Sequence, residues 1–115
     1  MVKEVTLEKW KIEFYESARG EKFVESFANS LEVSTRAKLT KLLDLLEKYG
    51  PHLSMPHSKI ITSGLYELRV RGKIEIRVLY TFKGEQIILL HAFKKQTQKT
   101  PDKEIATASQ RLKLI

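Results

Sequence analysis

The feature of this sequence that most constrains its fold is a repeated change in the spacing of its apolar residues. Near the start, Trp10, Ile12 and Phe14 alternate with polar residues, which predicts a half-buried strand over residues 9–15. Between residues 23 and 49 the apolar residues instead recur every three or four positions, as on one face of a helix. This part of the chain therefore predicts two helices joined near residues 29–32, which form a helical hairpin.

The second half of the chain returns to the spacing of strands. The hairpin ends at Gly50-Pro51, and residues 51–64 are predicted to form a loop. Three strands are then predicted, separated by turns at Gly72 and Gly84, and they cover residues 65–71, 73–82 and 85–93. A last helix is predicted from Thr100 as N-cap and Pro101 as first helical residue to the end of the chain.

The order strand, two helices, three strands, helix predicts an α+β fold. Short turns between the three later strands favour a mostly antiparallel sheet. We expect the N-terminal helical hairpin and the C-terminal helix to pack on one face of that sheet. A chain of 115 residues without repeats or linkers predicts one domain, residues 1–115.

The net charge of +7 is distributed unevenly along the chain. Residues 1–55 contain nine Lys/Arg and nine Asp/Glu, whereas residues 56–115 contain twelve and five. A basic excess confined to one half is typical of a surface that binds phosphate, although a solvated lysine-rich face is an equal alternative on charge alone. The sequence has no cysteine, no signal-peptide core and no apolar run that could span a membrane, so we expect a cytoplasmic protein without a membrane partner.

The basic excess falls on one face of the predicted sheet. Alternation along the strands places Arg69, Arg71 and Arg77 together, with Glu67 and Glu75 among them. If the apolar sets face the helices, this second face is open. A further cation, Lys73, begins the next predicted strand, and Lys94, Lys95 and Lys99 lie in the segment after the last strand. Guanidinium groups suit phosphate recognition, and the alternative is that the two glutamates pair with the arginines in cross-strand salt bridges.

Catalytic motifs are lacking elsewhere in the sequence. We find no metal-ligand spacing, no phosphate-binding glycine loop and no serine nucleophile motif. The arginines and lysines can stabilise a pentacovalent phosphate by charge. Six nearby groups could move protons if one of them has a shifted pKa, namely Tyr66, Tyr80, His57, His91, Glu67 and Glu75. Such a set suits a nuclease that uses the 2′-OH of RNA as nucleophile and needs neither metal nor cofactor. For Tyr66 and His91 the alternative is a place in the core.

Several short segments resemble the RelE/ParE toxin superfamily, and within it the HigB-type branch of phage-derived Gp49-like proteins. These segments cover most of the chain in the order and spacing of the family. They are LLDLLEKYGP at residues 42–51, GLYELR at 64–69, IRVLY at 76–80, AFKK at 92–95, QKTP at 98–101 and EI at 104–105.

The resemblance implies a RelE-like fold and the toxin of a type II toxin–antitoxin system. It implies an mRNA interferase, an endoribonuclease that cuts messenger RNA on the ribosome and so inhibits translation. The implied partners are messenger RNA, the ribosome and a cognate helix-turn-helix (HigA-like) antitoxin. By position, the residues of the RelE pattern that hold and activate the scissile phosphate correspond to Arg69, Arg77 and Lys95, with Arg71 and Lys94 as neighbours.

The chain departs from RelE at two positions. Glu67 stands where RelE has a lysine, and the last helix lacks the tyrosine that serves RelE as acid/base near its start. The proton-transfer group is therefore open between His91, Glu67, Tyr66 and catalysis by charge alone. Two other functions are also open: a ParE-like poison of DNA gyrase, and a non-catalytic phage-derived protein that only binds RNA or the ribosome.

Overall fold

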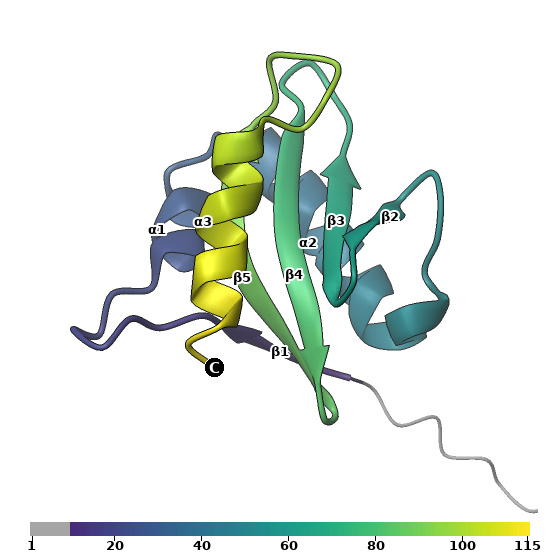
Figure 1. The fold of residues 1–115 in the computed structure, drawn as a ribbon. Helices are drawn as coiled ribbons and strands as arrows, with labels where there is room; N and C mark the ends of the chain where they lie inside the picture. The colour runs from purple at the N-terminus through teal and green to yellow at the C-terminus, as the bar shows by residue number, and fades with distance from the viewer. Residues whose placement is uncertain (1–9) are drawn as a thin grey trace, which may run out of the picture.

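The structure is a computed structural model that describes residues 10–115 (Figure 1). The predicted beginning of the first strand at Lys9 and the N-terminal residues before it lie outside the described residues. The strands and helices, in chain order, are β1 (Lys11–Phe14), α1 (Phe23–Asn29), α2 (Val33–Tyr49), β2 (Ser58–Thr62), β3 (Leu65–Val70), β4 (Ile76–Lys83), β5 (Gln86–Lys94) and α3 (Asp102–Leu112), with a short 3-10 helix, Gly50–His52, after α2. The predicted α+β class and the helical hairpin are confirmed.

Five strands form one mostly antiparallel sheet in the order β1-β5-β4-β3-β2. The predicted meander is confirmed, because β3 pairs antiparallel with β4 and β4 with β5. β1 lies at one edge and pairs parallel with β5. The other edge is β2, in a segment that we predicted to be a loop. β2 has the sequence Ser-Lys-Ile-Ile-Thr, in which polar and apolar residues do not alternate. The spacing that predicts a strand is therefore absent from this segment.

The helices cover both faces of the sheet rather than one. α1 and α2 lie behind the sheet in Figure 1, and α3 crosses its front over β5 and β4. Two separate apolar clusters fill the two interfaces. Val24, Leu39 and Leu46 belong to the first, while Ala108 and Ile105 of α3 belong to the second. The prediction of helices on one face was wrong, since the second face of β4 and β5 also carries apolar residues that α3 buries.

Alternation assigns side chains correctly along β3 and β4 but not along β5. Leu68 and Val78 face the helical hairpin, and Glu67, Arg69 and Arg77 point to the opposite face, as predicted. In β5 the register shifts opposite Leu79 and Tyr80. Strict alternation would place His91 on the face of Ile87 and Leu89, but this irregularity moves it to the face that α3 covers.

The predicted end of α2 is confirmed, whereas the predicted beginning of α3 is displaced by one residue. Gly50 ends α2 with a positive φ of 52°, the conformation that glycine adopts without strain. α3 begins one residue later than predicted, with Pro101 rather than Thr100 at the N-cap. The Thr100 hydroxyl instead donates a hydrogen bond to the buried carboxylate of Glu67. Among the described residues, no helix is both long and apolar enough to cross a membrane.

Candidate functional site

A polar hollow of about 440 Å³ opens at one end of the sheet, on the face that carries α3. It lies where β3 ends, β4 begins and the loop after β5 crosses over them (Figure 1). We call it the anion pocket. Its lining residues are Arg69, Arg71, Glu75, Arg77, Lys95, Gln96, Thr97 and Gln98. Four cations and three uncharged polar side chains surround one carboxylate, which gives the pocket an excess of positive charge.

A buried carboxylate holds two of the pocket arginines in place. Glu67 is only 1% exposed and its Oε1 lies 3.2 Å from Nε of Arg69 and 3.7 Å from Nε of Arg77. Its other oxygen accepts a hydrogen bond from the Thr100 hydroxyl, just before α3. These contacts connect β3, β4 and the loop after β5. We predicted Arg77 on an open face of the sheet. Because Arg77 is only 2% exposed, its guanidinium instead forms part of the floor of the pocket.

The remaining ionisable groups of the pocket are arranged around Arg77. Glu75 accepts a hydrogen bond of 2.9 Å from Nη2 of Arg77 and lies 3.8 Å from Nη1 of Arg71. The hydrogen bond and the charge of Arg77 lower the pKa of the Glu75 carboxyl from its ordinary value. Desolvation lowers the pKa of Lys95, and the nearby charge of Arg77 lowers it further. Glu75 is therefore an ionised carboxylate at neutral pH, and Lys95 releases a proton more readily than an ordinary lysine.

The structure brings together the four cations that the sequence placed at the centre of the site. Arg69, Arg71, Arg77 and Lys95 all line the anion pocket. The alternative that the glutamates pair with the arginines is also realised, through Glu67 and Glu75. Both statements hold because the cations outnumber the two carboxylates, so pairing does not remove the positive excess.

Two of the predicted site residues lie elsewhere. Nε2 of His91 lies 2.7 Å from Oε1 of Glu104, and Nδ1 lies 3.4 Å from Nη1 of Arg111, so both ring nitrogens contact α3. Tyr66 lies on the opposite face of the sheet, stacked on Tyr80 at 5.5 Å between ring centroids. Neither side chain lines the anion pocket. The core alternative was therefore correct for Tyr66, and His91 is a contact between β5 and α3.

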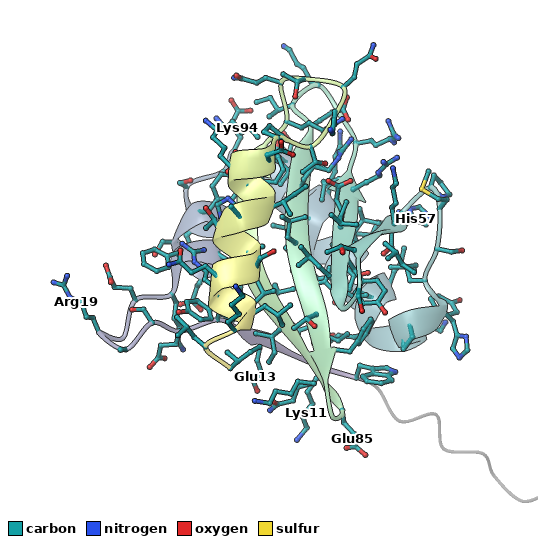
Figure 2. The ribbon with its side chains drawn as sticks, viewed as in Figure 1. Lys11, Glu13, Arg19, His57, Glu85 and Lys94 are labelled. Atoms are coloured by element: carbon teal, nitrogen blue, oxygen red, sulfur yellow. The ribbon has the colours of Figure 1, made fainter. Side chains whose placement is uncertain are left out.

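The remaining predicted contact residues, Lys94, Lys73, Lys99 and Glu67, do not line the anion pocket. Lys94 is exposed at the same end of the molecule (Figure 2), but it pairs with Ile76 on the face opposite the pocket. Lys73 is exposed in the turn between β3 and β4. Lys99 lines a neighbouring hollow, described below. Glu67 is buried beneath the arginines, so it positions them and does not itself face a ligand.

Sequence reasoning missed the role of Thr100. Threonine before proline at the beginning of a helix is a typical N-cap, and that pattern carries no sign of a partner 33 residues earlier in the chain. The sequence placed further cations in the segment after the last strand, beside the basic face. The structure confirms this placement, since Gln96, Thr97 and Gln98 line the pocket.

Comparison with known families identifies the chain. The model of the family described as "Phage derived protein Gp49-like (DUF891)" matches residues 26–113, most of the chain. The chain belongs to the Gp49-like family. The match contains the second half of α1, all of α2, the anion pocket and α3, so the Gp49-like region includes every part of the candidate site. A search of curated proteins finds no match to the sequence.

The site of this Gp49-like protein is suited to binding a tetrahedral oxyanion. Guanidinium and ammonium groups converge on one polar hollow, and a buried carboxylate fixes the geometry of two of them. Within residues 10–115, no three His, Asp or Glu side chains are grouped closely enough to hold a metal ion. A phosphodiester is the biological oxyanion that most directly fits an open, cationic hollow of this kind.

Proposed function

We propose that this protein is the toxin of a type II toxin–antitoxin system and acts as an mRNA interferase. The observation that carries the proposal is the convergence of Arg69, Arg71, Arg77 and Lys95 on one hollow. Membership of the Gp49-like family and the resemblance to RelE-type toxins support the same conclusion. Messenger RNA on the ribosome is the proposed substrate, the cytoplasm the proposed compartment, and a helix-turn-helix antitoxin the proposed inhibitor.

The proposed reaction uses the 2′-OH of the RNA as nucleophile. Its oxygen attacks the adjacent phosphorus, the bond to the 5′ oxygen breaks, and a cyclic phosphate and a 5′-OH result. Arg69 and Arg77 are fixed by Glu67 and stabilise the extra negative charge of the pentacovalent phosphate. Glu75 is ionised and lines the pocket, so it accepts the proton of the 2′-OH; its lowered pKa makes it a weak base, and the charge of the arginines supplies most of the stabilisation of the transition state. Lys95 has a lowered pKa, so it donates a proton to the leaving oxygen.

Induced expression in a bacterial host tests this function, with growth followed and transcript 5′ ends mapped. We compare the wild type with Lys95→Ala, a pocket variant that removes no buried charge, and with the control Lys83→Ala at the far end of β4. The wild type and the control are expected to arrest growth and to produce new in-frame ends on translated messages. Lys95→Ala is expected to lose about 100-fold in cleavage, as typical for loss of general acid catalysis.

A binding protein without catalytic activity is the second candidate, favoured by the position of His91. This imidazole is engaged by Glu104 and Arg111 on α3 and does not line the pocket. Growth arrest with intact messages contradicts the nuclease. In that case, loss of arrest in Lys95→Ala supports RNA binding alone, whereas arrest that is independent of Lys95 points to a protein target such as DNA gyrase.

A further inference from the structure

A second, smaller hollow adjoins the anion pocket. It measures about 210 Å³ and shares Arg69 and Gln98 with the anion pocket. We call it the side hollow. Ile60 and Ile61 of β2 and Ile105 of α3 contribute its apolar surface. The shared residues mean that a ligand held in one hollow can extend directly into the other.

The composition of the side hollow differs from that of the anion pocket. Its three isoleucines supply apolar area, while Lys59, Lys99 and Thr100 supply polar groups. A nucleobase needs this combination, because its faces are apolar and its edges carry hydrogen-bond donors and acceptors. The hollow is also smaller than the roughly 300–1,000 Å³ typical of sites for drug-sized ligands, so it fits one base better than a larger group.

The two shared residues are suited to joining a phosphate and a base. Nε of Arg69 donates to Glu67, which fixes the guanidinium plane between the two hollows. Such a plane can bind a phosphate oxygen at its edge and stack on a base with its face. The exposed amide of Gln98 offers both a donor and an acceptor to the edge of a base.

The loop that separates the two hollows is fixed by its own hydrogen bonds. The Thr97 hydroxyl donates to the carbonyl of Lys99 at 2.7 Å, and Nζ of Lys95 donates to the carbonyl of Gln98. The Thr100 hydroxyl anchors the end of the loop to Glu67. A loop that is held at both ends and in the middle keeps the two hollows at a constant separation, as needed to bind two parts of one nucleotide.

We propose that the side hollow binds the nucleobase next to the phosphate held in the anion pocket, and that it sets the base preference of the protein. The proposal rests on the proposed function insofar as the ligand is single-stranded RNA. Binding of a base in the side hollow does not itself require that the RNA is cut, so the two proposals can fail separately.

Nuclear magnetic resonance titration of the full chain tests the site directly. The probes are inorganic phosphate, which has no base, and the 3′-monophosphates of adenosine, guanosine, cytidine and uridine. Phosphate is expected to shift the amide signals of Arg77 and Lys95. At least one nucleotide is expected to shift these signals and also those of Ile61 and Ile105. The proposal is overturned if all nucleotides shift only the signals that phosphate shifts, or if none binds.

Two surface variants test the side hollow without removing pocket cations. Ile60→Ser changes a side chain that is 63% exposed, and Gln98→Ala removes the amide while leaving the backbone carbonyl that Lys95 uses. Each is expected to weaken binding of the preferred nucleotide about fivefold to tenfold, the worth of one hydrogen bond or a small apolar contact. Ile60 does not line the anion pocket, so Ile60→Ser is also expected to leave phosphate binding unchanged. The matched controls are Val33→Ser, exposed at the beginning of α2, and Gln110→Ala, exposed on α3.

The outcomes separate this proposal from the proposed function. Cleavage of messages in cells together with nucleotide shifts confined to the anion pocket leaves the nuclease in place and overturns the side hollow. Base-dependent shifts at Ile61 and Ile105 without any cleavage support the side hollow and overturn the nuclease. Equal effects of the variants and their controls also overturn the side hollow.

Discussion

At the scale of single residues, Glu67 is the group on which the geometry of the anion pocket depends. It is buried and contacts Arg69, Arg77 and Thr100. Nε of Arg77 has no hydrogen-bond partner among the described residues, so the 3.7 Å ion pair with Glu67 is its compensation for burial. A buried charge that loses its partner is strongly destabilising, which makes these residues interdependent.

We predict that Glu67→Gln lowers the free energy of unfolding by about 3–5 kcal/mol. The substitution keeps the shape of the side chain but removes the opposite charge beside Arg69 and leaves the buried guanidinium of Arg77 with Glu75 as its remaining carboxylate. Urea denaturation measures the change. The control Glu85→Gln is exposed in the turn after β4, at the end of the molecule labelled in Figure 2, and is expected to change stability by less than about 0.5 kcal/mol. Equal stability of both variants contradicts the role of Glu67.

We also predict a loss of stability at alkaline pH that originates at Tyr80. Burial raises the pKa of its hydroxyl from 10.0 to about 12, although the hydrogen bond with Ser58 partly opposes this. The raised pKa means that the stabilisation is complete below pH 10 and is lost as the pH rises toward 12. One pKa unit corresponds to about 1.4 kcal/mol, so the loss approaches about 3 kcal/mol. Chemical denaturation over a pH series measures it.

Two tyrosine variants isolate the contribution of Tyr80. Tyr80→Phe removes the ionisable hydroxyl, so stability is expected to fall less steeply between pH 10 and 12 than in the wild type. At neutral pH the variant is less stable by about 1–3 kcal/mol, because the buried hydroxyl of Ser58 loses its partner. Tyr49→Phe, at an exposed position, retains the pH dependence of the wild type. Identical curves for Tyr80→Phe and the wild type would falsify this assignment.

At the scale of helices and strands, the sequence predicts which elements form better than where they pack. The spacing of apolar residues identifies the hairpin, the meander and the last helix. It does not show that α3 lies on the other face, because Leu79, Ile88 and Leu90 belong to an interface with residues far along the chain. Alternation also cannot detect the irregularity in β5, which depends on pairing with β4 and moves His91 to the α3 side.

The sequence likewise predicts some features of the candidate site and not others. The charges of Arg69, Arg77 and Lys95 and their place near the ends of strands are visible in the sequence, and the structure brings them together. The burial of Arg77 and Glu67 is not visible, since charged residues are seldom fully buried unless they are paired. Only the fold supplies the partners, and Thr100, the most distant of them, gives no local signal.

We predict that the packing of α3 tolerates no larger residue at its centre. Ala108 is fully buried against the sheet, whereas Ala106 is exposed on the same helix. Ala108→Leu is expected to lower the free energy of unfolding by about 1–3 kcal/mol through overpacking. Ala106→Leu is expected to change it by less than about 0.5 kcal/mol. Thermal or urea denaturation measures both, and similar values for the two variants contradict the placement of α3 on the sheet.

At the scale of the whole molecule, the four cations of the anion pocket lie together at one end of the sheet. All of the net charge of +7 comes from residues 56–115, and the anion pocket lies at the end of the sheet near Lys94. The opposite end, where Lys11 and Glu85 lie in Figure 2, carries both signs. Lys83 follows Arg77 by six residues on β4, a separation of roughly 20 Å. That distance exceeds the screening length of about 8 Å at physiological salt, so the two ends act on a bound anion independently.

If the pocket binds RNA, removing one of its cations must change the salt dependence of binding, not only its strength. Each phosphate of single-stranded RNA that a protein neutralises contributes about −0.7 to the slope of log K against log salt. Arg71 is a suitable choice, because its side chain is 57% exposed and it is paired with Glu75 only at 3.8 Å. We predict that Arg71→Gln makes the slope less steep by about 0.7. Lys83→Gln removes the same charge at the other end of the sheet and leaves the slope unchanged. Fluorescence anisotropy of a labelled, unstructured RNA over a salt series measures both slopes. Equal reductions for the two variants mean that RNA responds to the net charge of the molecule, and then the anion pocket is not its binding site.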